Sequence, residues 1–429
     1  MIEVLEALFL LLTGVMLVYL VRHYVFTLTV LRLAQAPVGN VTLAASSLPE
    51  FEPSVTVLIP ARDEERVIGR LLQRMVESTY PKEKMQVIVI DDASSDGTGR
   101  IAQAYSEKYS YITVLHRDGK TGGRGKSAAM NYGFQHSNGE IVLCFDADYY
   151  PQADIVEKLT REFADPKVGA VQGRVVVLNE PQNIITRLVA LERIGGYRVD
   201  QEARENLGLI AQFGGTVGGF RHSVLELLGG WDESILAEDT DLTFRVYLAG
   251  YKVRYVGGAE CYEEAVDTWK AYRTQRYRWA LGHMDCFFRH SGKVLLSRNL
   301  RLKEKVDGLL LLGVYFMPLV ALLAFFVGIT LIFLQTSWLV SVLWFSVPVS
   351  FYSFVGNFAP FFEVGIDAYL DGRTRTLWLI PLLIFTFVYN MPICMKAFLN
   401  LSVSKIRRKR HFVWTKTRHS GNGNRYIAN

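Results

Sequence analysis

Long apolar stretches at both ends of the chain enclose a central region in which apolar runs are short. Residues 5–31 are almost all Leu, Val, Phe and Tyr, and about twenty such residues suffice to cross the hydrocarbon core of a membrane. Three more apolar stretches of spanning length lie at 306–334, 338–362 and 377–401. The pattern predicts an N-terminal transmembrane helix, a central domain, and a C-terminal membrane region of two or three segments.

In the central region, short apolar runs alternate with stretches that have helical spacing. Strands are expected at 55–60, 86–92, 112–116 and 140–145, and helices at 64–78, 97–108 and 126–136. Strands that are apolar throughout and alternate with helices indicate an α/β fold with a mostly parallel, doubly wound sheet. Such sheets bind ligands beyond the carboxyl ends of their strands, and polar residues cluster at those positions here.

Changes in composition divide the chain into successive parts. An N-terminal membrane helix is expected at 1–36, and a linker rich in Ala, Ser and Pro follows at 37–53. The further parts are the central α/β domain at 54–264, amphipathic membrane-interface helices at 265–301, membrane segments at 302–403 and a basic tail at 404–429.

The basic residues predict which side of the membrane each part occupies. Arg22 and His23, which are expected to snorkel, and Arg32 lie toward the C-terminal end of the first helix. The N-terminal flank carries Glu3 and Glu6 and is acidic, unlike that of a cleaved signal. We therefore expect an integral membrane protein of a prokaryotic plasma membrane, with its N-terminus outside and its central domain in the cytosol.

The C-terminal segments raise a counting problem. Three crossings after a cytosolic domain would place the basic cluster 405–410 outside, against the positive-inside rule. One segment is therefore expected to be re-entrant or interfacial, and Pro348, Gly356 and Pro360 break up the middle one. The sequence leaves open which segment it is.

Composition agrees with a membrane location, because 50% of the residues are hydrophobic. The net charge of +5 is modest, and the basic C-terminal cluster suits an anionic membrane surface better than nucleic acid. The four cysteines Cys144, Cys261, Cys286 and Cys394 are scattered and form no CxxC pair. Their spacing argues against a disulfide framework and against a cysteine metal site.

The expected strand at 140–145 ends in two carboxylates one residue apart, Asp146 and Asp148. At the carboxyl end of a buried strand, their oxygens suit a hard divalent cation, and such a cation neutralises a diphosphate. The alternative is an ordinary polar turn, in which Asp is common. The spacing alone does not separate the two interpretations.

Ordered motifs at strand ends and loops favour the metal site. They lie at 57–64 (VLIPARDE), 89–96 (VIDDASSD), 125–131 (GKSAAMN), 146–148 (DAD), 237–239 (AED) and 275–279 (QRYRW). In this order, they resemble the motifs of the membrane-integrated family 2 glycosyltransferases of GT-A fold, which include cellulose, hyaluronan, chitin-oligosaccharide and poly-N-acetylglucosamine synthases. The resemblance covers roughly residues 54–279, with a similar membrane arrangement around it.

The resemblance implies a nucleotide-sugar donor and a divalent metal, Mg²⁺ or Mn²⁺. Asp148 would be the direct metal ligand, and Asp146 would assist it and face the donor. The residues implied to hold the nucleoside are Ala61, Glu64, Asp91, Asp92 and Lys126. A lysine at a helix start is unfavourable for the helix dipole, which supports a ligand role for Lys126 over an ordinary surface position.

The acceptor side is implied by the later motifs. Asp239, with Glu238 beside it, would be the base that removes the proton of the acceptor hydroxyl. The chain departs from the usual Thr-Glu-Asp or Gly-Asp-Asp motif by having Ala237 at the first position, which leaves both acids intact. The alternative for Asp239 is the N-cap of a helix over 242–248.

The motif 275–279 would close the site. Arg278 would pair with the diphosphate, Trp279 would stack on an acceptor sugar, and Gln275 begins the motif. An amphipathic helix at the membrane surface is a compatible interpretation. The glycine-rich stretch 213–221 resembles an acceptor-side loop, with a flexible turn as the alternative, and the stretch 412–419 resembles a tail segment that folds back on the catalytic domain.

These features predict an inverting glycosyltransferase. The leading hypothesis is a processive synthase that polymerises UDP-GlcNAc or UDP-glucose into a β-linked polysaccharide and passes it across the membrane. The alternative enzyme adds a single sugar to a membrane lipid. A catalytically silent scaffold or glycan-binding subunit is a third class, but Asp92, Asp146, Asp148 and Asp239 are all present. The donor sugar and any accessory subunit leave no signature in these residues.

Overall fold

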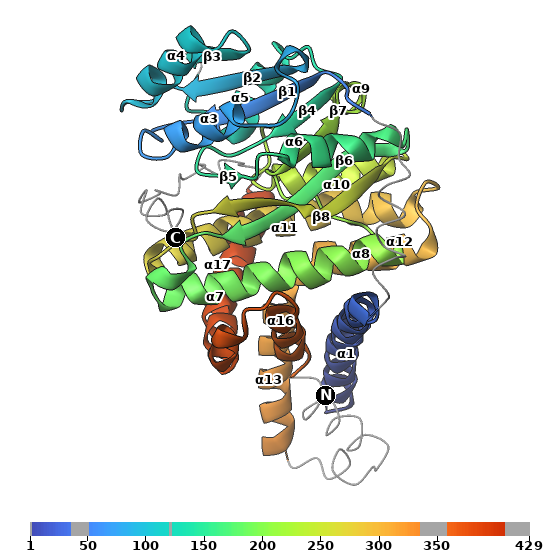
Figure 1. Cartoon of the computed structure of the whole chain (residues 1–429). Coiled ribbons are helices and arrows are strands. Elements are labelled where there is room, and N and C mark those ends of the chain that lie inside the picture. The colour runs from blue at the N-terminus through green and yellow to red at the C-terminus, as the bar shows by residue number, and fades with distance from the viewer. Residues whose placement is uncertain (1, 36–50, 120–121, 335–357, 408–429) are drawn as a thin grey trace.

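The computed structural model describes residues 2–35, 51–119, 122–334 and 358–407. A mixed sheet lies at one end of the molecule and a group of long helices at the other (Figure 1). The predicted linker, the middle apolar segment at 338–362 and the tail lie largely outside the described residues.

The first half of the sheet is parallel, as predicted. Strand β1 lies between β2 and β4, and β3 pairs with the other edge of β2. The strands are β1 (Val55–Ala61), β2 (Met85–Asp92), β3 (Ile112–Arg117) and β4 (Ile141–Cys144), and the intervening helices are α3 (Ile68–Val76), α4 (Thr98–Lys108) and α5 (Lys126–Phe134), with a short 3-10 turn η1 (Lys82–Lys84). Strands β1 and β4 lie inside the sheet, and apart from Thr56 of β1 their residues are apolar, as expected for parallel strands covered on both faces.

Helix α3 begins at Ile68, four residues after the predicted start at residue 64. The chain before it is held in a loop, because Asp63 has a left-handed φ of 52°. The Asp63 carboxylate accepts a hydrogen bond of 2.7 Å from the Ser95 amide, and Glu65 accepts one of 2.9 Å from the Gly97 amide. These bonds tie the loop after β1 to the loop after β2.

The second half of the sheet is mixed. The eight described strands run in the order β3-β2-β1-β4-β7-β6-β8-β5, and β7 is antiparallel to both β4 and β6. Strand β8 is parallel to β6 and antiparallel to β5. The strands are β5 (Tyr150–Pro151), β6 (Val168–Val177), β7 (Gly218–Arg221) and β8 (Lys252–Glu263).

Helices of the second half separate the sheet from the membrane segments (Figure 1). Helix α7, the π-helix η4 and α8 follow one another without a break, and α11 crosses beside them. The bounds are α6 (Ile155–Arg161), η2 (Glu162–Ala164), η3 (Glu180–Gln182), α7 (Ile184–Ile194), η4 (Gly195–Gln201), α8 (Glu202–Leu207), α9 (His222–Leu227), α10 (Glu238–Leu248) and α11 (Trp269–Leu296).

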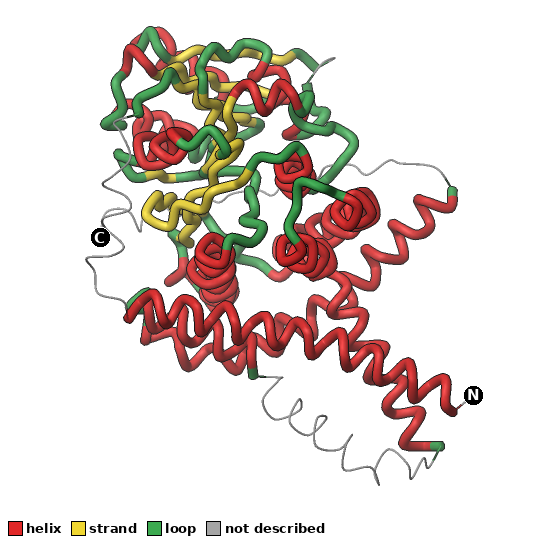
Figure 2. The backbone as a smooth tube through the Cα atoms, turned by 90° about the vertical axis from the view of Figure 1, so that its right-hand side faces the viewer, coloured by secondary structure: helices red, strands yellow, loops and turns green. Residues whose placement is uncertain are grey.

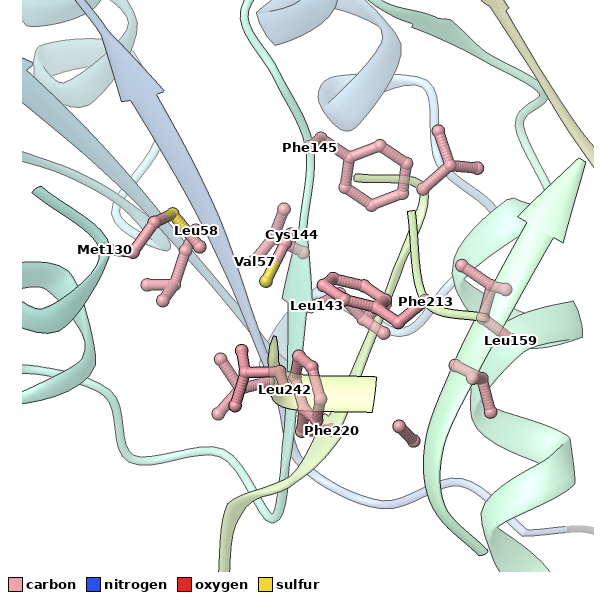
Figure 3. Packing of buried hydrophobic residues seen from close by; sticks show 14 of the residues in the cluster. Val57, Leu58, Met130, Leu143, Cys144, Phe145, Leu159, Phe213, Phe220 and Leu242 are labelled. Carbon is pink, nitrogen blue, oxygen red and sulfur yellow. The ribbon is translucent and has the colours of Figure 1, made fainter. Parts of the chain in front are cut away.

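The core joins the two halves of the sheet (Figure 3). Phe145, which follows β4, and Phe213 and Phe220, which flank the glycine-rich stretch, are all fully buried. The rings of Phe213 and Phe220 meet edge to face, with centroids 4.6 Å apart. Burying each such side chain stabilises the fold by roughly 1.5–3 kcal/mol. The packing therefore holds the loop after β4 and the loop before β7 in fixed positions relative to each other.

Within the described residues, three helical stretches are long and apolar enough to cross a membrane: 2–35, 302–331 and 374–406. Helices α1, α13, α16 and α17 extend away from the parallel half of the sheet (Figures 1 and 2). Their bounds, with the short helices beside them, are α1 (Ile2–Gln35), α12 (Leu302–Gly313), η5 (Val314–Phe316), α13 (Met317–Phe333), α16 (Ala359–Leu370), η7 (Thr374–Leu382) and α17 (Leu383–Ile406).

Buried ion pairs attach α1 to the rest of the molecule. Arg22, which is only 8% exposed, lies 3.2 Å from Asp200 of η4 and 3.7 Å from Asp307 of α12. His23 Nδ1 lies 2.5 Å from Glu363 Oε2 of α16. Instead of snorkelling into solvent, as expected, both side chains join the membrane helix to its neighbours.

Candidate active site

A cavity opens where the carboxyl ends of β1 and β4 meet α5, α10 and α11. Most predicted site residues line it together with side chains that the sequence did not indicate. The lining includes Ala61, Arg62, Glu64, Asp92, Lys126, Asp146, Asp148, Tyr149, Arg193, Gly214, Gly215, Thr216, Glu238, Asp239, Glu263, Glu264, Gln275, Arg278 and Trp279. Motifs that are far apart in sequence therefore converge on one cavity.

The two acids at the end of β2 point in different directions. Asp92 Oδ1 faces the cavity side and accepts hydrogen bonds from Arg117 Nη1 at 2.6 Å and from the Gly123 amide at 3.0 Å. Asp91 lies outside the cavity lining, and its Oδ2 is 3.0 Å from His116 Nδ1. Successive strand residues point to opposite faces, which explains the difference. A nucleoside contact by Asp91 stays a prediction.

Lys126, at the start of α5, points into the cavity. Its ammonium lies 2.5 Å from Asp146 Oδ1 and donates a 3.0 Å hydrogen bond to the Gly215 carbonyl. Burial lowers the pKa of Lys126, but Asp146 and Glu238 more than offset this and raise the pKa above its ordinary value. The Lys126 side chain is therefore a fixed positive charge between Asp146 and the loop at Gly215.

The cavity has an excess of negative charge. Among the described residues, eight Asp and Glu side chains and four Lys and Arg side chains line it. A bound diphosphate would be repelled by this surplus unless a cation accompanied it. The described part of the chain contains no group of three or more His, Cys, Asp or Glu arranged to hold a metal ion. Asp146 and Asp148 together with phosphate oxygens are a ligand set that suits Mg²⁺, so the residues fit a metal–diphosphate unit.

The predicted base lies in the first turn of α10. The N-cap residue of this helix is Ala237, and no side chain caps it, so the alternative role of Asp239 as the N-cap does not apply. Asp239 Oδ1 accepts a 2.6 Å hydrogen bond from the Thr240 amide. Burial and the adjacent Asp239 raise the pKa of Glu238 to about 7, although Lys126 opposes this shift. The two neighbouring acids therefore differ in their chemistry.

The glycine-rich stretch is a held loop rather than a flexible turn. Gln172, which is fully buried, accepts a 2.6 Å bond from the Gly214 amide and donates a 3.0 Å bond to the Thr216 carbonyl. Gly215 has a φ of +85°, and a Cβ on it would lie 3.4 Å from the Cβ of Asp239. Glycine thus lets this backbone lie close to the predicted base.

Helix α11 contributes Gln275, Arg278 and Trp279 to the cavity, which agrees with their spacing on one helix face. Burial lowers the pKa of Arg278, and the charges of Glu238, Asp146 and Asp239 partly offset this effect. The Trp279 ring lies 4.4 Å from the Arg276 guanidinium and 5.0 Å from that of Arg193. Two cations therefore already contact the aromatic ring that is expected to stack on a sugar.

Sequence reasoning missed several charged residues of the lining, among them the pair of Glu263 and Arg193. Glu263, at the end of β8, accepts from Arg193 at Nε (2.5 Å) and Nη2 (3.1 Å), and from the Tyr149 hydroxyl at 2.7 Å. Burial lowers the pKa of Arg193, but Glu263 raises it by more, so the guanidinium stays charged. The sequence carried part of the signal, because the run 252–263 ends in Glu263 and a second acid, Glu264, follows it directly.

The chain matches known proteins over much of its length. The family model described as glycosyl transferase family group 2 matches residues 141–393. A probable glycosyltransferase YdaM from Bacillus subtilis (strain 168) is 42% identical over 232 residues, which are 54% of this chain and 55% of that protein. A β-monoglucosyldiacylglycerol synthase from Synechocystis sp. (strain ATCC 27184 / PCC 6803 / Kazusa) is 34% identical over 239 residues, or 56% and 49% of the two chains.

The chain spans about half the length of these curated relatives. Among solved structures, mannosyltransferase PcManGT from Pyrobaculum calidifontis, in complex with GDP-Man and Mn²⁺, has a TM-score of 0.56 at 23% identity. The likeness covers 87% of this chain and 99% of that one, and at this identity it concerns the fold. Because the family model covers more than half of the 429 residues, the chain belongs to the family 2 glycosyltransferases, and its sheet has their GT-A arrangement.

Proposed function

We propose that the protein is an inverting hexosyltransferase that uses a nucleoside-diphosphate sugar and an acceptor at the membrane surface. One observation carries this proposal. The strand-end carboxylates Asp146 and Asp148, the acid Asp239 and the arginine of α11 converge on one cavity. That combination serves a reaction in which a diphosphate leaves while a hydroxyl loses its proton.

The donor side would hold the leaving group. Asp146 and Asp148 would bind Mg²⁺ or Mn²⁺, which supplies charge neutralisation for the departing diphosphate. Lys126, 2.5 Å from Asp146, and Arg278, which interacts electrostatically with Asp146, add positive charge to the same cavity. The GDP-Man and Mn²⁺ of the similar mannosyltransferase structure support a nucleotide-sugar donor with a divalent metal.

On the acceptor side, Asp239 would take the proton of the attacking hydroxyl. The acceptor oxygen forms a bond to the anomeric carbon while the bond from that carbon to the diphosphate oxygen breaks. One displacement of this kind inverts the configuration of the sugar. The 2.6 Å hydrogen bond from the Thr240 amide to Asp239 Oδ1 favours a single orientation of this carboxylate.

The acceptor is proposed to be a membrane lipid. Helix α11, which carries Trp279, packs against α17. Ala280 and Met284 of α11 share an apolar cluster with Cys394 and Ala397 of α17. The similarity to a β-monoglucosyldiacylglycerol synthase supports a single hexose on a lipid. The second candidate is the polymer synthase, which the Trp279 position and the motif 275–279 favour, because a ring at the acceptor end suits a growing glycan.

A donor and product assay tests both candidates. The full chain, purified in detergent, is incubated with Mn²⁺ or Mg²⁺, diacylglycerol or a bacterial lipid extract, and one of UDP-glucose, UDP-GlcNAc or GDP-mannose. We expect nucleotide release with one donor and a lipid product heavier by one hexose in mass spectra. A ladder of products that grows with time would establish the polymer synthase instead. Donor-dependent nucleotide release at the level of a boiled sample would overturn the proposed function.

A further inference from the structure

The helix that carries the motif 275–279 touches the start of α10 at a glycine. A Cβ on Gly282 would lie 2.7 Å from both the amide nitrogen and the Cβ of Ala237, the residue that begins α10. Only a glycine allows backbones to come this close. The close crossing brings the next residue of α11, His283, to the first turn of α10, where the proposed base lies.

His283 meets that turn through Thr240. The imidazole Nδ1 lies 3.2 Å from Thr240 Oγ1, and this threonine is fully buried. Thr240 Oγ1 also accepts a 3.0 Å hydrogen bond from Gln212 Nε2. This bond uses an acceptor site of the Thr240 hydroxyl and leaves its hydrogen for donation to the imidazole.

The same threonine holds the carboxylate of the base. Its amide donates a 2.6 Å hydrogen bond to Asp239 Oδ1. Thr243 Oγ1 donates a second bond of 2.8 Å to the Asp239 carbonyl. The side chain of Thr240 is therefore fixed from one side by Gln212 and from the other by His283, while its amide orients the acid.

The imidazole is itself held by a membrane segment. Its ring lies 4.6 Å from the ring of Tyr315 at an angle of 30°. Tyr315 belongs to η5, the short 3-10 helix that interrupts the apolar stretch 302–331. Burial lowers the pKa of His283, with Asp239 opposing this, so the ring stays neutral and keeps a nitrogen that accepts a hydrogen bond.

We propose that His283 is a positioning residue of the transfer reaction, which holds Thr240 and, through it, the Asp239 carboxylate in the orientation that receives the acceptor proton. The inference rests on the proposed function and adds a residue to it. His283 is absent from the cavity lining, so its action is indirect. If the Asp239 carboxylate is displaced, kcat falls. Donor binding, which takes place on the other side of the cavity, is unaffected.

Kinetics of three variants test the role. In His283→Ala we expect kcat to fall about tenfold, because small misplacements of a catalytic group are costly, while the KM for the donor stays within about twofold. His283→Asn places an acceptor near the position of Nδ1 and is expected to restore kcat to within about threefold of the wild type. Thr240→Val, which removes the hydroxyl and keeps the shape, should match His283→Ala.

The double variant separates a hydrogen-bonded chain from two independent effects. Residues that act through one another are non-additive, so His283→Ala combined with Thr240→Val should lose about tenfold rather than about a hundredfold. His136→Ala, in the exposed turn after α5, is the matched control and should keep the wild-type kcat. Thermal unfolding of each variant verifies that it is folded.

The outcomes are distinct from those of the proposed function. If the wild type transfers no sugar, the proposed function itself fails. With an active wild type, a normal kcat in His283→Ala overturns the inference. It is equally overturned if His283→Asn is as slow as His283→Ala, if the donor KM rises in proportion to the loss, or if the double variant is fully additive. Should His283→Ala not fold, the comparison of Thr240→Val with Thr240→Ser decides, with loss expected only in the former.

Discussion

The donor half and the acceptor half of the cavity are built by different means. On the donor side, side chains come from the ends of adjacent parallel strands, and short bonds such as Asp63 to Ser95 fix the loops between them. On the acceptor side, they come from α7, α10, α11 and β8, joined by buried charges such as Glu263 with Arg193. The first construction is local along the chain, and the second depends on distant segments.

The difference extends to the membrane segments. The Tyr272 hydroxyl donates a 2.9 Å bond to Glu192 and accepts a 3.1 Å bond from Asn390 of α17. Glu192 also pairs with Arg276, whose guanidinium covers Trp279. A continuous polar network therefore joins the acceptor end of the cavity to a membrane helix. Changes on the acceptor side should affect catalysis and stability together, and changes on the donor side should affect mainly donor use.

Asp239→Asn is expected to have the largest effect, with a large loss of kcat and little change in donor binding. Loss of a general base costs about 10²–10⁴-fold in rate, so kcat should fall by that factor. The Asn side chain keeps an oxygen for the Thr240 amide, so the helix start is retained. UDP binding, measured by calorimetry, should stay within about twofold of the wild type, because the donor half is untouched.

The control is Glu226→Gln, which removes an exposed carboxylate of α9 outside the cavity lining and should leave kcat unchanged. Wild-type turnover in Asp239→Asn would remove this residue as the base. A loss of UDP binding as large as the loss of rate would show that the two halves are not separable.

Asp148→Asn is the corresponding change on the donor side. Loss of an outer-shell partner of a metal ligand typically costs roughly 10–100-fold in metal affinity, so removing the proposed direct ligand Asp148 should weaken metal use by at least that factor. The activity-against-Mn²⁺ curve should shift to higher concentration, and EDTA should abolish the wild-type reaction. An unshifted curve would exclude Asp148 as a ligand. The unfolding midpoint should change less than in the acceptor-side variant described below.

The same division explains what the sequence could predict. The strands β1 to β4 and the acids Asp92, Asp146 and Asp148 were predictable, because apolar runs that end in carboxylates are local patterns. Strand β7 has the sequence GGFR and gives no such pattern, so the mixed half of the sheet was missed. The start of α3 was misplaced because the left-handed Asp63 depends on a partner loop some thirty residues later.

The acceptor side was predicted only where motifs marked it. Asp239, Arg278 and Trp279 were found through their motifs, and all three line the cavity. Arg193 and Glu263 were missed, because a salt bridge between residues seventy positions apart follows from tertiary packing rather than from local spacing. The burial of Arg22 beside Asp200 has the same cause.

Glu263→Gln, on the acceptor side, should lower the stability of the fold. Glu263 is 6% exposed and accepts from both Arg193 and Tyr149. Replacing it leaves the buried Arg193 charge unpaired, which should lower the free energy of unfolding by about 2 kcal/mol. Denaturant unfolding of the full chain in detergent measures this. The control is Glu157→Gln, whose exposed pair with Arg161 should contribute less than about 1 kcal/mol.

The smallest expected effect concerns the two acids at the boundary of the halves. The pKa of Glu238 is raised from 4.5 to about 7, so the folded protein resists its ionisation. The stabilisation that this group provides is complete below about pH 4.5 and is lost as the pH rises through 7.

The free energy of unfolding of the wild type should therefore decrease as the pH rises from about 5 to 8, and Glu238→Gln should make this decrease smaller by about 1 kcal/mol or less, since Glu238 is half-buried. Histidines titrate in the same window, so the difference between the two proteins is the relevant quantity. If the wild type and Glu238→Gln showed the same dependence of stability on pH, Lys126, 2.5 Å from Asp146, would offset the charges of both Asp146 and Glu238. In that case the donor and acceptor halves would share one electrostatic unit, and Lys126→Met should restore the difference in slope.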